Sequence, residues 1–309
     1  MNGLKLSETY YLEMVAPEIK RSCPKALSFL AAGLVGEGSE CFGFDDEISQ
    51  DHDFGPRVCL WLTEEGEEQY GEALRSVLEK TKESCDRHFS SLQTKEAAGR
   101  SGVLKISEFY QKYTGKAAGP GTWQEWIKLP QEHLATCTNG AVFWDAAGEF
   151  TAVRKRLLGY YPEDVRIKKI VAKAALAAQA GQYNFERCLR RGEQTAATMA
   201  LGEFLKHSME LVYLLNRTYM PYYKWSHRGL YGISSVPGAW EEFNAIVRAG
   251  INAPKACSEH IEVLCTMILK ALRRQKLCSG TDPYLLAHTE EMTAQIKDPA
   301  IRALPVMFG

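Results

Sequence analysis

The sequence predicts an α+β protein, with a small mixed β-sheet and flanking helices over residues 1–150 and an all-helical domain over residues 151–309. Three observations predict this fold. Four short apolar runs bounded by turn-forming residues all lie before residue 150. From about Phe150 to Glu291 the pattern is almost entirely helix-like. No Gly/Ser-rich linker separates the two halves, so we expect them to pack together.

The first predicted elements are helices, a buried strand and a tight turn. Residues 8–20 have helical spacing, which Pro17 is expected to interrupt, and Pro24 can begin a second helix. The apolar run Ala31 to Val35 then leads into Gly36-Glu37-Gly38-Ser39. An apolar run that ends in glycines predicts a buried strand entering a tight turn.

Two more strands and two helices follow in the first half. Residues 58–62 predict a second strand, and the acids that come next open a helix over residues 64–83, where they suit the helix dipole. Residues 103–106 predict a third strand. Ser107 can cap a short helix that starts at Glu108.

A fourth short strand over residues 142–144 precedes the helical half. The amphipathic run Ala253 to Arg274, with Val263 on its apolar side, is expected to pack against this chain or against a second copy, so a homodimer stays open. The helical pattern is broken by proline or glycine at Pro162, Gly192, Pro221, Pro237, Pro254 and Gly280.

Composition excludes several classes of protein. Lys+Arg is 37 and Asp+Glu is 38 in 309 residues, so the chain lacks the basic excess of a dedicated nucleic-acid binder, and a long nucleic acid is not the expected partner. The apolar run Ile170 to Ala178 is too short to span a membrane, and no signal peptide is recognised, so we expect no membrane contact. Nine cysteines without a Cys-x-x-Cys pair predict reduced thiols in a cytoplasmic protein.

The most informative segment is the acidic stretch after the glycine turn. Gly38 and Ser39 offer backbone N–H groups and a hydroxyl that can receive phosphate. Asp51 comes twelve residues after Ser39, and Asp51 and Asp53 lie on the segment that enters the second strand. In an extended chain residues i and i+2 share one face, so these carboxylates form a pair that a divalent cation such as Mg²⁺ relieves of repulsion.

Other interpretations of this stretch are a solvated acidic loop, an EF-hand and a P-loop. Asp-x-Asp by itself favours the solvated loop, but the Gly-Ser turn between two apolar strands reverses that preference. The EF-hand lacks its glycine and terminal glutamate at the right offsets. The P-loop lacks a Gly-Lys-Ser/Thr after the turn.

Gly38-Ser39, the gap and Asp51-x-Asp53 together resemble the nucleotidyltransferase superfamily related to DNA polymerase beta, although His52 stands where that family usually has an apolar residue. The chain also resembles bacterial proteins with domain of unknown function 4037 over roughly residues 5–230. The segment from Gly33 to Arg57 carries this second resemblance, and so does a second block from about 126 to 225. The second block contains Trp126-Ile-Lys-Leu-Pro130, Gly140-Ala-Val-Phe-Trp-Asp145, Tyr160-Tyr-Pro-Glu-Asp164 and Tyr219-Met-Pro-Tyr-Tyr-Lys-Trp225.

The resemblance implies a nucleotidyltransferase-type sheet and a site for an NTP. It implies that Gly38 and Ser39 hold phosphate, with Ser49 and Arg57 as further phosphate contacts, and that Asp51 and Asp53 are catalytic ligands of Mg²⁺ or Mn²⁺.

The resemblance also implies a third catalytic carboxylate on a later strand. Glu108 is slightly preferred over Asp145 for this role. Glu108 is equally well explained as the first acid of a helix, and Asp145 as a turn residue before Gly148.

Two cations of the helical half are candidate nucleotide contacts. Arg187 shares a helix face with Arg191, although an ordinary charged face is the more common explanation. Lys224 stands among Tyr222, Tyr223 and Trp225, which can stack on a base or anchor one helix to another, and the resemblance favours the site-facing role.

The expected function is Mg²⁺-dependent transfer of NMP from an NTP, with ATP as the expected donor, to a hydroxyl or phosphate of a small molecule or protein. The alternative is a catalytically silent nucleotide-binding or regulatory module of the same fold. The missing clear third carboxylate supports that alternative. The acceptor and the nucleobase preference are not encoded in any motif.

Overall fold

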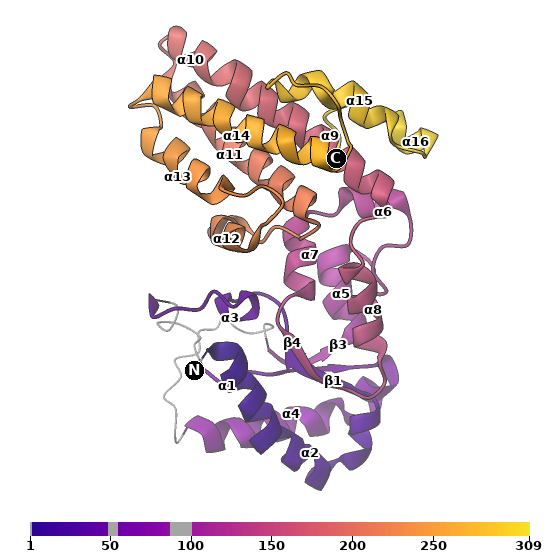
Figure 1. Ribbon diagram of the computed structural model, residues 1–309. Coiled ribbons are helices and arrows are strands. Elements are labelled where there is room, and N and C mark those ends of the chain that lie inside the picture. The colour runs from indigo at the N-terminus through magenta and orange to yellow at the C-terminus, as the bar shows by residue number, and fades with distance from the viewer. Residues whose placement is uncertain (1, 49–54, 87–100) are drawn as a thin grey trace. The chain divides into compact units, whose positions relative to one another are not determined.

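The computed structural model describes residues 2–48, 55–86 and 101–309 (Figure 1). The chain forms two compact units, each built from two segments. The first unit contains Met1–Pro120 and His133–Gly159, and the second contains Gly121–Glu132 and Tyr160–Gly309. The expected boundary at residue 150 falls inside helix α8, which belongs to the first unit.

A four-stranded mixed sheet in the order β3-β2-β1-β4 is the centre of the first unit. β1 pairs antiparallel with both β2 and β4, whereas β2 and β3 are parallel. A register shift between Ala32 and Gly33 interrupts the regular pairing of β1 with β4. The strands are β1 Leu30–Leu34, β2 Cys59–Leu62, β3 Gly102–Lys105 and β4 Ala141–Asp145.

Helices cover both faces of this sheet. On one face the apolar side chains of α1, α2 and α4 pack on Leu30, Ala32, Leu60 and Leu62. On the other face Trp61 stacks on Phe150 of α8 with ring centroids 4.1 Å apart, and Phe109 of α5 meets its edge. The helices of the first unit are α1 Gly3–Tyr10, η1 Tyr11–Val15, α2 Ala16–Ser22, η2 Pro24–Ser28, α3 Ser39–Phe42, α4 Glu64–Asp86, α5 Ile106–Thr114 and α8 Glu149–Leu158, together with α7 Gln131–Thr138, whose first two residues belong to the second unit.

The described part of the second unit consists of helices and connecting loops. In it α9 packs against α11, and α14 packs on α13. Its helices are α6 Trp123–Lys128, α9 Glu163–Ala177, η5 Ala178–Phe185, α10 Glu186–Arg190, α11 Gln194–Asn216, α12 Tyr223–Gly229, η6 Leu230–Gly232, α13 Ala239–Ala249, α14 Pro254–Arg274, η7 Leu285–His288, α15 Thr289–Ala294 and α16 Pro299–Arg302.

The α+β class and the four predicted strands are confirmed. The break expected at Pro17 is wrong. A π-helical turn over Tyr11–Val15 precedes α2, and the N–H of Ala16 bonds to Tyr11 five residues back. Pro17 is the second residue of α2, and the helical backbone continues through it from the π-helical turn.

The cap expected at Ser107 is also wrong. α5 begins one residue earlier, at Ile106, and its N-cap is Lys105. The Ser107 hydroxyl instead donates to the carboxylate of Glu64, at the start of α4. The Ser107 hydroxyl therefore bonds to an acid of another helix and does not cap α5.

Among the residues that the structure describes, no helix is both long and apolar enough to cross a membrane. The cysteines whose side chains it describes all carry free thiols. Burial raises the pKa of the Cys59 and Cys137 thiols to about 12. These thiols therefore stay protonated and unreactive near neutral pH.

Candidate functional site

The turn that leaves β1 is the first feature of the candidate site. β1 is buried along its whole length, and its chain continues through Gly36, Glu37 and Gly38 into α3 at Ser39. Gly38 has φ 145° and ψ 145°, a conformation that is essentially restricted to glycine. A Cβ at Gly38 would lie 2.8 Å from a carboxylate oxygen of Glu40. Both backbone and neighbours thus require glycine at this position.

The side-chain amide of Asn139 holds the turn in place. Its Oδ1 accepts the N–H of Gly36 at 2.9 Å, and its Nδ2 donates to the carbonyl of Gly36 at 2.8 Å. The two bonds together fix both the position and the orientation of the Gly36 peptide groups. Asn139 follows α7 and lies in the same unit as β1.

A second layer of contacts fixes Asn139 itself. Arg154 of α8 donates to the carbonyl of Asn139 at 2.7 Å and to that of Gly140 at 3.3 Å. Gly140 has φ 60°, and a Cβ there would lie 1.9 Å from the carbonyl oxygen of Leu34. The loop before β4 can therefore approach the end of β1 only because residue 140 is glycine.

Glu40 and Arg57 form a buried ion pair beside Ser39. Each residue is 8 % exposed, and the Arg57 guanidinium donates to the Glu40 carboxylate. The pair neutralises a carboxylate next to the turn and ties α3 to the segment that enters β2. This contact places Arg57 next to the turn; a phosphate contact by Arg57 stays a prediction.

Glu37 and Lys112 give the turn its exposed charges. Lys112 of α5 lies 2.9 Å from a Glu37 carboxylate oxygen, and Tyr113 donates to the same oxygen at 3.3 Å. Burial, followed by the charge of Glu37, raises the pKa of Tyr113 above its ordinary value, so this phenol stays a donor. Lys112 is a cation at the turn that the sequence patterns do not single out.

The expected metal ligands Asp51 and Asp53, together with Ser49, lie outside the described residues. Among the described residues no group of three or more His, Cys, Asp or Glu side chains is arranged to hold a metal ion. The two carboxylates of the turn, on Glu37 and Glu40, are already paired with cations. The assignment of Asp51 and Asp53 as metal ligands is therefore based on the sequence alone.

The strand register places Glu108 and Asp145 at the opposite ends of the strands from the Gly-Ser turn. The end of β1 lies beside the start of β2, because Gly33 pairs with Cys59. The end of β3 lies beside the end of β2, and Asp145 pairs with Ala31 near the start of β1. At 3.3 Å per residue the two ends of a strand such as β2 are about 10 Å apart.

Local contacts account for both of these acids. Glu108 is exposed and lies 3.4 Å from the ammonium group of Lys105. Asp145 accepts the N–H of Gly148 at 2.8 Å and that of Thr151 at 2.7 Å, so its carboxylate is occupied by N–H groups at the start of α8. The structure therefore brings neither acid to the Gly-Ser turn.

Arg187 and Lys224 are not brought together either. Arg187 precedes α11 and bonds to the Tyr183 hydroxyl at 2.6 Å, with its guanidinium over that ring. Lys224 follows α11 and lies 5.1 Å from the Trp225 ring centroid. Figure 1 shows α10 and α12 towards opposite ends of α11, a helix about 34 Å long. The two cations belong to different surfaces.

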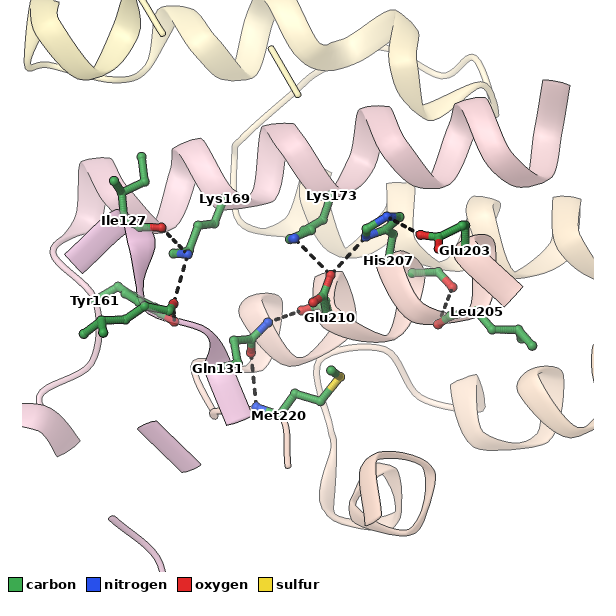
Figure 2. A network of polar contacts seen from close by, with 12 residues as sticks. Ile127, Gln131, Tyr161, Lys169, Lys173, Glu203, Leu205, His207, Glu210 and Met220 are labelled. Atoms are coloured by element: carbon green, nitrogen blue, oxygen red, sulfur yellow. Dashed lines mark hydrogen bonds and ion pairs between the residues drawn. The ribbon is translucent and has the colours of Figure 1, made fainter. Parts of the chain in front are cut away.

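A buried polar network joins α9 and α11 in the second unit (Figure 2). The carboxylate of Glu210 lies 3.1 Å from Lys173 and 3.1 Å from Nδ1 of His207. Nε2 of His207 lies 3.1 Å from Glu203. Burial by itself would raise the pKa of Glu210, but the hydrogen bond with His207 and the charge of Lys173 hold it below its ordinary value.

The same network holds residues 127–131 against the helices. Lys169 donates to the carbonyls of Ile127 and Leu129 at 2.7 and 3.2 Å. Gln131 donates to the carbonyl of Glu210 at 3.1 Å. Burial, with a smaller effect of Lys173, lowers the pKa of Lys169 to about 7. These contacts explain why Gly121–Glu132 belongs to the second unit.

Comparison with known proteins gives one match. A family model described as "Domain of unknown function (DUF4037)" matches residues 126–226, which confirms the expected 4037-type block. No curated protein and no solved structure matches the chain. The matched block contains both Asn139, which holds the Gly-Ser turn, and the network of the second unit.

Proposed function

We propose that this protein binds an NTP, with ATP as the expected donor, on the Gly36–Ser39 turn and transfers its NMP group to an acceptor hydroxyl or phosphate. In this reaction an acceptor oxygen attacks the α-phosphorus, the bond from that phosphorus to the β-phosphate oxygen breaks, and pyrophosphate leaves. Bound Mg²⁺ or Mn²⁺ supplies charge stabilisation at the phosphates.

The observation that carries this proposal is that the turn after β1 and the segment that enters β2 meet at the same end of the strands. The turn leaves β1 where β2 begins, and Asp53 of the sequence Asp51-His52-Asp53 stands six residues before the first residue of β2. Arg57 pairs with Glu40 beside the turn, and four residues of chain reach at most about 14 Å from it to Asp53. Asp51 and Asp53 are the proposed metal ligands.

The other proposed roles follow from the chemistry of the turn. Backbone N–H groups of Gly38 and Ser39 and the Ser39 hydroxyl receive phosphate oxygens. Lys112 lies beside Glu37 and adds positive charge there. Asn139 holds the turn and Arg154 holds Asn139, so both are positioning residues. Ser49 is a further proposed phosphate contact.

A second candidate function is nucleotide binding without transfer. Glu108 and Asp145 lie at the opposite ends of the strands, and each already contacts neighbouring residues, which favours this alternative. Under this alternative the acceptor is absent, and the bound NTP regulates a partner.

The test combines a thermal-shift screen with a transfer assay. The four NTPs with and without Mg²⁺ are screened first, and ligands that bind only the folded state raise its melting temperature. The protein is then incubated with ATP labelled at the α- or the γ-phosphate and with candidate small-molecule and protein acceptors. Transfer of the α-label alone supports the proposed reaction.

Three outcomes decide between the proposals. A Mg²⁺-dependent NTP shift with α-label transfer supports nucleotidyl transfer. The same shift with no transfer to any acceptor supports the binding module. No shift with any NTP contradicts both proposals.

A further inference from the structure

An open cavity of about 670 Å³ lies at the C-terminal end of α14, in the second unit. Four of its lining side chains are cationic and one is acidic. The cations are Lys270, Arg273, Arg274 and Lys276, and the acid is Glu291. This volume is within the usual range for small-molecule sites.

Three of these cations lie close together on α14, where their charges repel one another. Lys270, Arg273 and Arg274 follow the i, i+3, i+4 spacing, so they project from one face of α14. Like charges at this spacing destabilise a helix. Over the described residues, no carboxylate lies within ion-pair distance of Lys270, Arg273 or Lys276. The arrangement leaves a concentrated positive charge that a bound anion would neutralise.

The helix dipole explains only part of this charge. Arg273 and Arg274 lie in the last turn, where cations offset the negative end of the dipole. Lys270 is one turn earlier, and Lys276 comes after the helix has ended. The dipole acts only within the last turn, so it does not account for these two lysines.

Lys276 has an unfavourable backbone conformation. Its φ is 59°, in the left-handed region that the residue after a helix usually occupies as glycine. The N–H of Lys276 bonds to Arg273 at 2.9 Å and that of Leu277 to Leu272 at 3.0 Å, which is the Schellman pattern. A lysine at this position costs stability and directs a cation to the cavity.

The cavity wall is fixed by hydrogen bonds from the neighbouring segment. Gln295 donates to the carbonyls of Lys276 and Leu277 at 2.8 and 3.2 Å. The carboxylate of Glu291 accepts the N–H of Ser279 at 3.0 Å, and this bond lowers the pKa of Glu291. Arg274 donates to the carbonyl of Ser235 at 2.5 Å. Glu291 is thus ionised, and the four cations leave a formal excess of +3.

We propose that this cavity binds a compact organic polyphosphate, a small molecule with at least two phosphate groups. Arginine and lysine donors suit phosphate oxygens, and an excess of three positive charges requires more than one phosphate. The charge is gathered in one cavity of a chain whose net charge is -1, which favours a small polyanion over a nucleic-acid strand. The site lies outside the matched family block and does not depend on the proposed nucleotidyl transfer.

Calorimetric titration of the full chain with inorganic tripolyphosphate tests the proposal. The experiment is done with EDTA, and again on the Asp51→Asn/Asp53→Asn variant, so that the proposed Mg²⁺-dependent NTP site does not contribute. We expect saturable binding with one site per chain, weakening as salt is added. A single-stranded oligonucleotide of twelve nucleotides is titrated in parallel.

Two variants and one matched control complete the experiment. The Lys270→Gln/Arg273→Gln variant should bind tripolyphosphate at least tenfold more weakly. Lys276→Gly should also bind more weakly, yet melt about 2 °C higher, because glycine relieves the left-handed conformation. Arg248→Gln/Lys255→Gln removes two exposed cations from the same unit and should bind as the wild type does.

Several results would overturn the proposal. These are no binding of tripolyphosphate, equal affinity in all variants and control, or binding of the oligonucleotide in place of tripolyphosphate. Because Lys276→Gly is expected to be more stable than the wild type, its loss of affinity cannot be ascribed to unfolding.

Discussion

At the scale of single residues, Asn139 is the side chain on which the geometry of the Gly-Ser turn depends most. It satisfies both the N–H and the carbonyl of Gly36, and its own carbonyl is held by Arg154. The sequence did not single it out, because an asparagine before a glycine is first of all a turn signal. Only the pairing of β1 with β4 shows that residue 139 reaches residue 36.

Replacing Asn139 tests this positioning role. Asn139→Ala leaves two half-buried peptide groups without their partner, so we expect a loss of about 1–3 kcal/mol in the free energy of unfolding. Affinity for Mg²⁺–ATP should fall at least tenfold. Asn139→Asp keeps the acceptor for the Gly36 N–H and should lose less stability. Urea unfolding and calorimetry measure both effects; unchanged ATP affinity in Asn139→Ala would remove the residue from the proposal.

The glycines of the turn allow a matched comparison. Gly38→Ala combines a strained backbone with a close contact to Glu40 and should cost about 1–3 kcal/mol. Gly43 also has a positive φ, of 68°, but no atom lies within 4 Å of the position of its Cβ. Gly43→Ala should therefore lose stability and keep ATP binding, whereas Gly38→Ala should lose both. Equal ATP affinity in the two variants would argue against phosphate binding at Gly38.

At the scale of elements, the apolar patterns predicted the strands well and the helix boundaries less well. β1 and β2 are buried on both faces, so continuous apolar runs marked them. Pro17 misled because a π-helical turn precedes it, and Ser107 because its hydroxyl bonds to an acid of another helix. The apolar side expected for α14 was also partly wrong, since Val263 is 45 % exposed. Such contacts between distant segments leave no periodic signal.

The buried Lys169 of α9 predicts that the free energy of unfolding depends measurably on pH. Burial lowers the pKa of Lys169 to about 7, whereas an unfolded lysine has a pKa near 10.5. Between these values the unfolded chain holds a proton that the folded chain lacks. The free energy of unfolding should therefore rise with pH in this window, by up to about 1.4 kcal/mol per pH unit for this group. Lys173, Glu210, Glu132 and Tyr161 are the charged and titratable groups around it.

Urea unfolding between pH 7.5 and 9 checks this prediction. Lys169→Met should lower stability and flatten the rise with pH, because its proton no longer differs between the two states. Lys168, whose pKa burial lowers to about 8, still contributes to the remaining slope. Lys255→Met, at an exposed site, should leave the slope unchanged. Parallel pH profiles of the wild type and Lys169→Met would contradict the prediction.

At the scale of the whole molecule, the order of segments along the chain differs from the order of the compact units. The sheet needs β4, which comes after the segment Gly121–Glu132 of the second unit. Sequence patterns placed the change from sheet to helices near residue 150, but they carried no sign of this exchange. Buried contacts such as those of Lys169 with Ile127 and Leu129 create it.

Two fragments test this organisation. A fragment of residues 1–120 lacks β4, so β1 has an unpaired, fully buried edge, and we expect it to aggregate. A fragment of residues 1–159 retains the complete sheet and should unfold cooperatively. Circular dichroism during heating, with light scattering, distinguishes the two. Cooperative unfolding of residues 1–120 would show that β4 is dispensable.

The central claim is that the Gly-Ser turn and the carboxylates Asp51 and Asp53 form one Mg²⁺-dependent NTP site, and calorimetric titration with ATP and Mg²⁺ tests it most directly. We expect the wild type to bind and the Asp51→Asn/Asp53→Asn variant to lose binding while keeping its melting temperature. The matched Glu68→Gln/Glu79→Gln variant removes two exposed acids of α4 and should bind as the wild type does. Equal ATP affinity in the wild type and the Asp51/Asp53 double variant would contradict the claim.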